Sequence, residues 1–156
     1  MDGIIEADET FFRLSFKGSH KKSTFKMPRE SRRRGGSAHK RGLSLEQVCV
    51  PCAIDRKGHS YAKIATLGRV ETKNLHAVYD GKICQGSTLC TDKMNSYARF
   101  AKSKNIQLLQ LKSGKEKRGI YNIQKINNYH SKFKMFMTTF NGVSTKYLNN
   151  YLVWHT

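Results

Sequence analysis

The sequence predicts an α/β domain in which a mixed, five-stranded sheet is flanked by helices. Three observations indicate this class. β-Prone runs come first in the chain, and helical patterns then alternate with further strands. The helical segments carry apolar residues at three- and four-residue intervals. The length of 156 residues suits one domain with its own core, so residues 1–156 are expected to form a single unit.

The first part of the chain holds three predicted strands. Residues 3–12 combine Ile, Thr and Phe, which favour extended backbone. Residues 45–55 and 60–67 are expected to form a hairpin around a Lys-Gly turn. Between the first two strands, residues 13–43 carry 11 Lys or Arg with Glu30 as the one acid, together with many Ser and Gly. This composition predicts a flexible basic loop.

The second part of the chain alternates helices with strands. We expect helices at 71–80, 95–104, 126–140 and 144–154, strands at 87–91 and 106–111, and a second basic loop at 112–119. Three strands followed by alternating units give a mixed sheet with helices on its faces. The same order of elements is found in ribonuclease-H-like folds.

The charge of the chain points to a polyanionic partner. Basic residues number 29 and acidic residues 11, which gives a net charge of +18. Nucleic acid is the first candidate, because phosphate contacts dominate its affinity for proteins. An anionic membrane surface is disfavoured, since no basic amphipathic helix or lipidation signal is present. Without a signal peptide or an apolar run of about 18 residues, the chain is predicted to be cytoplasmic, in bacteria associated with the nucleoid.

The four cysteines do not form a zinc-ribbon pattern. Cys49 and Cys52 make one C-x-x-C pair, but Cys84 and Cys90 are six positions apart, so the second pair is missing. Cys49 and Cys52 fall within a predicted strand, where they would point to opposite faces. We therefore interpret them as buried structural thiols in a protein with reduced cysteines; half of a metal site is the alternative.

Two aspartates stand at the ends of predicted strands. Asp8 closes an apolar run, and Asp92 follows the strand at 87–91. Because side chains alternate along a strand, Glu6 and Asp8 share one face while Glu9 takes the other. Carboxylates at strand ends are suited to hold a divalent cation for phosphodiester chemistry. Solvated strand-end acids are the alternative interpretation of each aspartate alone.

A polar stripe runs along the predicted helix at 126–140. Asn127, His130, Ser131 and Lys134 fall at i, i+3, i+4 and i+7 and so share one side of that helix. Such a stripe is commonly a solvated face, but this one mixes an amide, an imidazole, a hydroxyl and an ammonium. No acid follows Glu116 in the sequence. A third ligand from the C-terminal part is therefore either Glu116 or the carbonyl oxygen of Asn127, which hard cations accept.

Several segments together resemble a known family. IIEADETFF, LCTDKMNSY and INNYHSKFKMF, followed by FNGVSTKYLNNYLVW, are similar to the catalytic domain of insertion-sequence transposases of the ISXO-two-like class. These are ribonuclease-H-like enzymes of the DDE type, and some subgroups replace the final Glu by Asn and follow it with Lys. The resemblance implies that Asp8, Asp92 and Asn127 are catalytic metal ligands and that Lys134 contacts DNA near the scissile phosphate.

The resemblance also implies an activity and its partners. It predicts metal-dependent cleavage and strand transfer of double-stranded DNA, at the ends of an element and at its target, with two Mg²⁺ (or Mn²⁺) ions. Transposases commonly act as dimers or larger assemblies, so a homo-oligomer on DNA is compatible with it. His130 and Ser131 match an HS pair in the same helix of the family and are carried as supporting residues.

Two further expectations concern DNA binding. The basic loop is interpreted as a clamp on the DNA backbone rather than a merely solvated segment, through Arg32, Arg33, Arg34, Lys40 and Arg41. Related transposases carry a zinc ribbon or helix-turn-helix upstream, and the sequence predicts that this module is missing here. Two other functions stay open: a non-catalytic nucleic-acid-binding remnant of a transposase, and a ribonuclease-H-like nuclease acting on RNA–DNA hybrids.

Overall fold

A single mixed sheet organises the computed structural model, which describes residues 1–19, 24–29, 42–112 and 116–156. Its strand order is β3-β2-β1-β5-β6, and β4 also pairs with β2. The central strand β1 is antiparallel to β2 and parallel to β5. The strands are β1 (Ile4–Arg13), β2 (Gln47–Asp55), β3 (Ser60–Ala62), β4 (Thr66–Leu67), β5 (Thr88–Thr91) and β6 (Gln107–Gln110).

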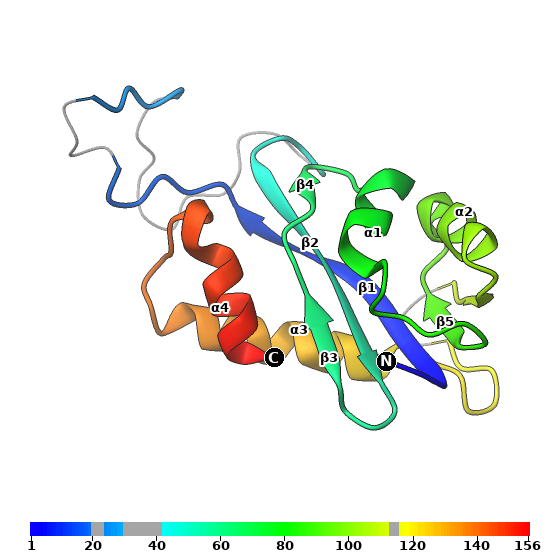
Figure 1. Ribbon diagram of the computed structural model, residues 1–156. Helices are drawn as coiled ribbons and strands as arrows, with labels where there is room; N and C mark the ends of the chain where they lie inside the picture. Colours follow the sequence, from blue (N-terminus) through cyan, green and yellow to red (C-terminus); the bar gives the residue numbers. More distant parts are fainter. Residues whose placement is uncertain (20–23, 30–41, 113–115) are drawn as a thin grey trace.

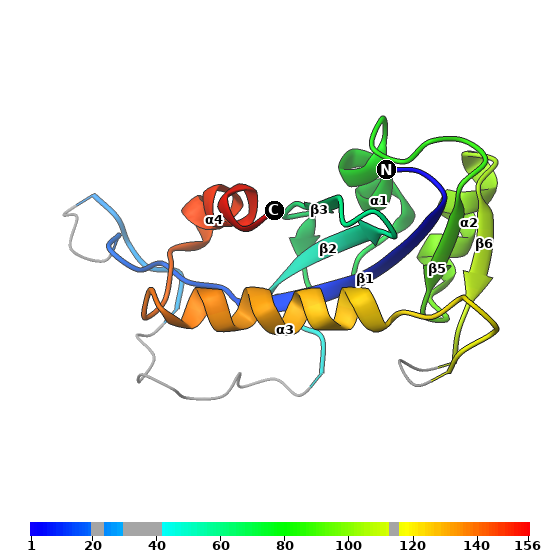
Figure 2. The same cartoon turned by 90° about the horizontal axis from the view of Figure 1, so that it is seen from below.

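Helices cover both faces of this sheet, as the sequence predicts. The helices are α1 (Thr72–Tyr79), α2 (Asn95–Ser103), α3 (Gln124–Thr138) and α4 (Leu148–His155), the last preceded by a 3₁₀ turn at Thr145–Tyr147. Figure 2 shows α3 running along one side of the sheet, next to β1, with α1 and α2 on the other side. The predicted α/β class and its ribonuclease-H-like order of elements are confirmed.

The expected third strand divides into two, so the sheet has six strands rather than five. Cys52 pairs with Ala62 and Cys49 pairs with Thr66, so residues 63–65 oppose only residues 50–51. The carbonyl of Pro51 accepts a hydrogen bond from the Lys63 N–H at 3.4 Å, but proline has no N–H to return it. The extra residue beside this proline forms a bulge that interrupts the ladder.

Each face of the sheet carries its own apolar core. One core joins β1 to α1 and α2 and includes Cys49, whereas the other joins β1 and β2 to α3 and α4 and includes Cys52. Both thiols are buried and free. The interpretation of Cys49 and Cys52 as buried thiols on opposite faces is therefore confirmed.

The beginning of the predicted basic loop is tied to the body of the protein. Arg13 belongs to β1, and the Lys17 ammonium donates to the carbonyl of Gly142 at 2.7 Å, beyond the end of α3. The Ser15 N–H donates to the Thr145 hydroxyl at 2.9 Å. These contacts give residues 14–17 a fixed path that composition alone did not predict. The proposed clamp residues lie outside the described residues: Arg32, Arg33, Arg34, Lys40 and Arg41.

No helix in the described part of the chain combines the length and apolar character needed to cross a membrane.

Candidate active site

The two aspartates stand side by side because of the parallel register of β1 and β5. Ile4 pairs with Thr88 and Glu6 pairs with Cys90. The same offset of 84 positions takes Asp8 to Asp92. Asp92 directly follows β5, which ends at Thr91. The fold therefore brings Asp8 and Asp92 near each other where β5 ends, close enough for the charge of Asp92 to act on Asp8.

Gln110 holds the loop that carries Asp92. Its side-chain amide donates to the backbone carbonyl of Asp92 at 3.1 Å and to that of Met94 at 3.0 Å. The Asp92 carboxylate accepts the Met94 N–H at 3.2 Å. These bonds fix the turn between β5 and α2 and orient one carboxylate oxygen. The second oxygen is left for another ligand.

The pKa values of both aspartates are raised. Burial raises the pKa of Asp8 to about 6; the adjacent backbone N–H of Glu9 opposes the rise, the negative charge of Asp92 adds to it, and the Lys134 ammonium lowers it. Burial likewise raises the pKa of Asp92, against the Met94 N–H. A cation beside these two half-buried carboxylates would favour their ionised forms.

Two residues of the polar stripe of α3, His130 and Lys134, lie near Asp8. His130 Nδ1 lies 3.8 Å from Asp8 Oδ2, too far for a hydrogen bond. Burial lowers the pKa of His130 to about 4, with Lys134 contributing, so the imidazole is neutral at pH 7. The contact is then polar and not an ion pair. Ser131 is exposed, and its hydroxyl donates to the Asn127 carbonyl of its own helix at 3.0 Å.

Asn127 lies one turn before His130 on the same side of α3, with its side chain half-buried. Within the described ranges this side chain makes no hydrogen bond, whereas its backbone N–H donates to Ile123 at 3.3 Å. No three His, Cys, Asp or Glu side chains in the described part of the chain group into a metal site by themselves. An oxygen-ligand site here would combine the two aspartates with this amide.

Glu9 is a buried acid that the sequence analysis did not single out. It lies on the opposite face of β1 from Asp8, as the alternation predicts, and is 9% exposed. Burial raises the pKa of Glu9 to about 8; the charge of Asp8 adds to the rise and the neighbouring Tyr97 hydroxyl opposes it. Glu9 Oε1 has no hydrogen-bond partner in the described residues. The signal available in the sequence was the acid directly after Asp8.

The metal-free protein is expected to lose stability as the pH rises from 5 to 8. The folded-state pKa of Glu9 is raised from 4.5 to about 8, so its contribution is fully present below pH 4.5 and is lost as the pH passes 8. The stability of Glu9→Gln should vary less with pH, and at pH 8 the variant should keep about a few kcal/mol of the stability that the unsubstituted protein has lost. Urea unfolding in EDTA from pH 5 to 8 measures it. Parallel curves for the two proteins would contradict the prediction.

Glu6 joins β1 to the start of α3. Its carboxylate is fully buried, with Oε1 2.8 Å from Arg56 Nη1 and Oε2 accepting the Ile126 N–H at 3.1 Å. Arg56 in turn donates to the Ile120 carbonyl at 2.9 Å, and Lys125 Nζ donates to the Arg56 carbonyl at 2.9 Å. Because Glu6 is two residues before Asp8 and Ile126 directly precedes Asn127, this network sets the position of β1 relative to the candidate ligands on α3.

A basic groove opens beside Asp92 on the side of α1 and α2. Its volume is about 750 Å³, and Asp92 lies in its wall. Glu71 is the other acid of the wall, and it pairs with Lys73 at 2.9 Å. The remaining charged residues of the groove are cations: Arg69, Lys73, Lys93 and Arg99. An anionic chain placed here would pass directly over the Asp92 carboxylate.

The sheet order, the two strand-end aspartates and the helix α3 above them define a ribonuclease-H-like domain. In keeping with this class, the chain is similar in structure to a chain of the simian T-cell lymphotropic virus intasome in complex with PP2A regulatory subunit B56 gamma. The TM-score is 0.52 at 13% sequence identity, over 99% of this chain and 46% of that one. At this identity the similarity concerns the fold.

The family itself follows from the sequence match. Residues 1–153 match the ISXO2-like transposase domain, and the chain belongs to this family. The resemblance seen in the separate motifs is thereby confirmed over nearly the whole sequence. No curated protein gave a match.

Proposed function

We propose that this chain is the catalytic domain of a DNA transposase that cleaves and transfers DNA strands with divalent cations. The observation that carries the proposal is that Asp92, at the end of β5, lies near Asp8 of the neighbouring parallel strand β1, beside His130 and Lys134 of α3. Membership of the transposase family supports the substrate, and the ribonuclease-H-like fold supports the reaction class.

The residues of the site fit Mg²⁺ or Mn²⁺. Two carboxylates and an amide carbonyl are hard oxygen ligands, and the raised pKa values of Asp8 and Asp92 mark a place where a cation relieves repulsion. Asp8, Asp92 and Asn127 would hold the metal, and two ions are proposed. When bound, such ions supply activation of water or of a DNA 3′-hydroxyl and stabilise the leaving oxygen.

The other polar residues of the site have roles in placing DNA and in tuning Asp8. The Lys134 ammonium, which already lowers the pKa of Asp8, would contact a phosphate next to the scissile bond. Because His130 is buried and neutral, it adds no second positive charge next to the proposed metal ligands. Gln110 fixes the backbone of Asp92 and so the direction of its free oxygen. These side chains position charge; none is proposed to form a covalent intermediate with DNA.

Substitution of the aspartates tests the proposed function. Asp8→Ala and Asp92→Ala should abolish Mg²⁺-dependent nicking and strand transfer on supercoiled plasmid DNA, while DNA affinity in EDTA stays within about threefold, because affinity comes mainly from phosphate contacts. Asp80→Ala, at an exposed acid after α1, is the control and should keep activity. Undiminished nicking by either aspartate variant would exclude these residues. Cleavage restricted to RNA–DNA hybrids would identify a nuclease instead.

The groove beside Asp92 is proposed to bind the DNA backbone. Arg99→Ala should weaken binding to duplexes of different sequence equally and lower the slope of log affinity against log salt concentration by about one. Lys102→Ala is a matched control, since Lys102 is an exposed cation one turn further along α2, outside the groove. Fluorescence anisotropy at several salt concentrations measures both. An identical change in the two variants would place the DNA elsewhere.

A further inference from the structure

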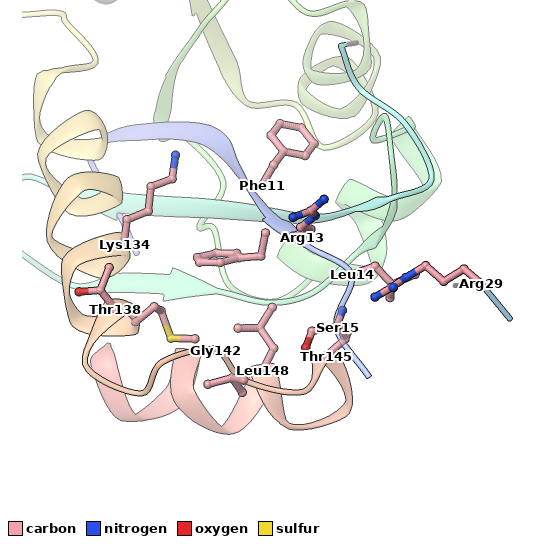
Figure 3. A pocket seen from close by; sticks show the side chains of 13 residues that line it. Phe11, Arg13, Leu14, Ser15, Arg29, Lys134, Thr138, Gly142, Thr145 and Leu148 are labelled. Carbon is pink, nitrogen blue, oxygen red and sulfur yellow. The ribbon is translucent and has the colours of Figure 1, made fainter. Parts of the chain in front are cut away.

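A second cavity lies beyond the candidate ligands, where β1 leaves the sheet. It has a volume of about 530 Å³ and is open to the surface near Lys134. Figure 3 shows Lys134 and Thr138 of α3 along one wall and Arg13, Leu14 and Ser15 along the opposite wall, with Leu148 at its base. This size is within the range of pockets that hold small organic groups.

The lining of this cavity combines apolar and aromatic surface with positive charge. Phe12 contributes its ring, which is held edge-on by Phe133 with ring centroids 5.1 Å apart. Phe11 lines the cavity from the neighbouring position of β1, but its side chain packs against the core on the other face of the sheet. Arg13, Arg29 and Lys134 are the charged members of the thirteen described lining residues, and none of the thirteen is an acid. An occupant that matches both features has a flat apolar part joined to an anion.

The cavity adjoins the candidate active site through Lys134. Lys134 lines its wall and also acts on the charge of Asp8. Phe11 and Phe12 follow Asp8 by three and four residues on the same strand. A DNA strand whose phosphate meets Lys134 would therefore bring its next nucleotide to the mouth of this cavity.

We propose that this cavity receives one unpaired nucleobase of the DNA strand that runs through the active site. The base would lie against Phe12, and its flanking phosphates would meet Arg13 and Lys134. Stacking on aromatic rings tolerates any base, so the cavity selects single-stranded character rather than sequence. The inference rests on the proposed function, because it takes DNA as the substrate, but it concerns binding and requires no metal.

Binding to strands with and without bases tests this subsite. In EDTA, a twelve-residue oligothymidylate should bind about tenfold more tightly than the same backbone made of abasic residues. Thr138→Trp should remove this difference by placing an indole in the cavity wall, while Thr139→Trp, one position on and outside the cavity, should keep it. Equal binding of the two strands by the unsubstituted chain overturns the inference. Base-dependent binding that persists in Thr138→Trp also overturns it.

The position of the base is checked independently of any variant. A strand containing 5-iodouracil, irradiated on the unsubstituted chain, should cross-link within the tryptic peptide 1–13, which holds both phenylalanines. Cross-links confined to other peptides would overturn the inference even if Thr138→Trp failed to fold. Phe12→Leu should lower the cross-linked yield several-fold while the salt slope of binding stays unchanged.

The outcomes separate this inference from the proposed function. Base-dependent binding without any Mg²⁺-dependent nicking would support the subsite and reject the transposase activity. Mg²⁺-dependent nicking by a chain that binds both strands equally would support the transposase activity and reject the subsite. The oligomeric state without DNA gives a further outcome. If the unsubstituted chain and Thr139→Trp are dimers while Thr138→Trp is a monomer, a second copy of the chain fills the cavity, and the inference is overturned.

Discussion

Glu6→Ala is expected to lower the free energy of unfolding by about 2–4 kcal/mol, because it removes a buried acceptor and the partner of a partly exposed guanidinium. The substitution leaves the Arg56 guanidinium without its carboxylate at 2.8 Å and the Ile126 N–H without its acceptor at 3.1 Å. Burial raises the pKa of Glu6, while the Ile126 N–H and Arg56 oppose the rise. Urea unfolding at pH 7 measures the loss.

Two comparisons make this result specific. Glu6→Gln keeps an acceptor for the Ile126 N–H but loses the charge, so it should cost about 1–3 kcal/mol. Asp2→Asn breaks an exposed pair with Lys57 at 3.0 Å and should leave the unfolding midpoint unchanged. Hydrogen exchange at the Ile126 amide should accelerate in Glu6→Ala. A loss no larger than that of Asp2→Asn would show that this network does not fix α3 to β1.

Local patterns in the sequence predicted the elements that carry the candidate site. The alternation of residues 3–12 placed Asp8 and Glu9 on opposite faces, and the helical spacing after Asn127 placed His130 and Lys134 on one side of α3; the structure agrees with both. The same alternation predicted opposite faces for Cys49 and Cys52. The periods of 2.0 and 3.6 residues follow from the backbone geometry of strands and helices, so they can be used before the tertiary fold is known.

Contacts between distant segments could not be predicted in this way. The pairing of Glu6 with Arg56 spans 50 positions, and the hold of Lys17 on the Gly142 carbonyl spans 125. The burial of Glu9 depends on α2 packing over that face of β1, which no local pattern encodes. The division of the third strand has a local cause that the prediction of one strand at 60–67 left out, because Pro51 of the neighbouring strand has no N–H for the ladder.

Asn127→Glu is expected to raise the affinity for Mg²⁺ or Mn²⁺ by about tenfold or more. The change adds a negative charge where an amide now lies, beside carboxylates whose pKa values are already raised. A unit charge at about 4 Å in an effective dielectric near 20 is worth about 4 kcal/mol per unit of cation charge before desolvation. Metal titration by calorimetry, with the metal-dependent rise in unfolding temperature as a second readout, measures the change.

The neighbouring residue supplies the matched control. Asn128 is exposed on α3, so Asn128→Glu adds the same charge one position away and should leave metal affinity within about twofold, because exposed charges are screened. Asn127→Ala should weaken metal binding, since it removes an oxygen ligand without adding charge. Equal metal affinity in the Glu variants at the two positions would place Asn127 outside the site. The two aspartates would then need a third ligand from elsewhere.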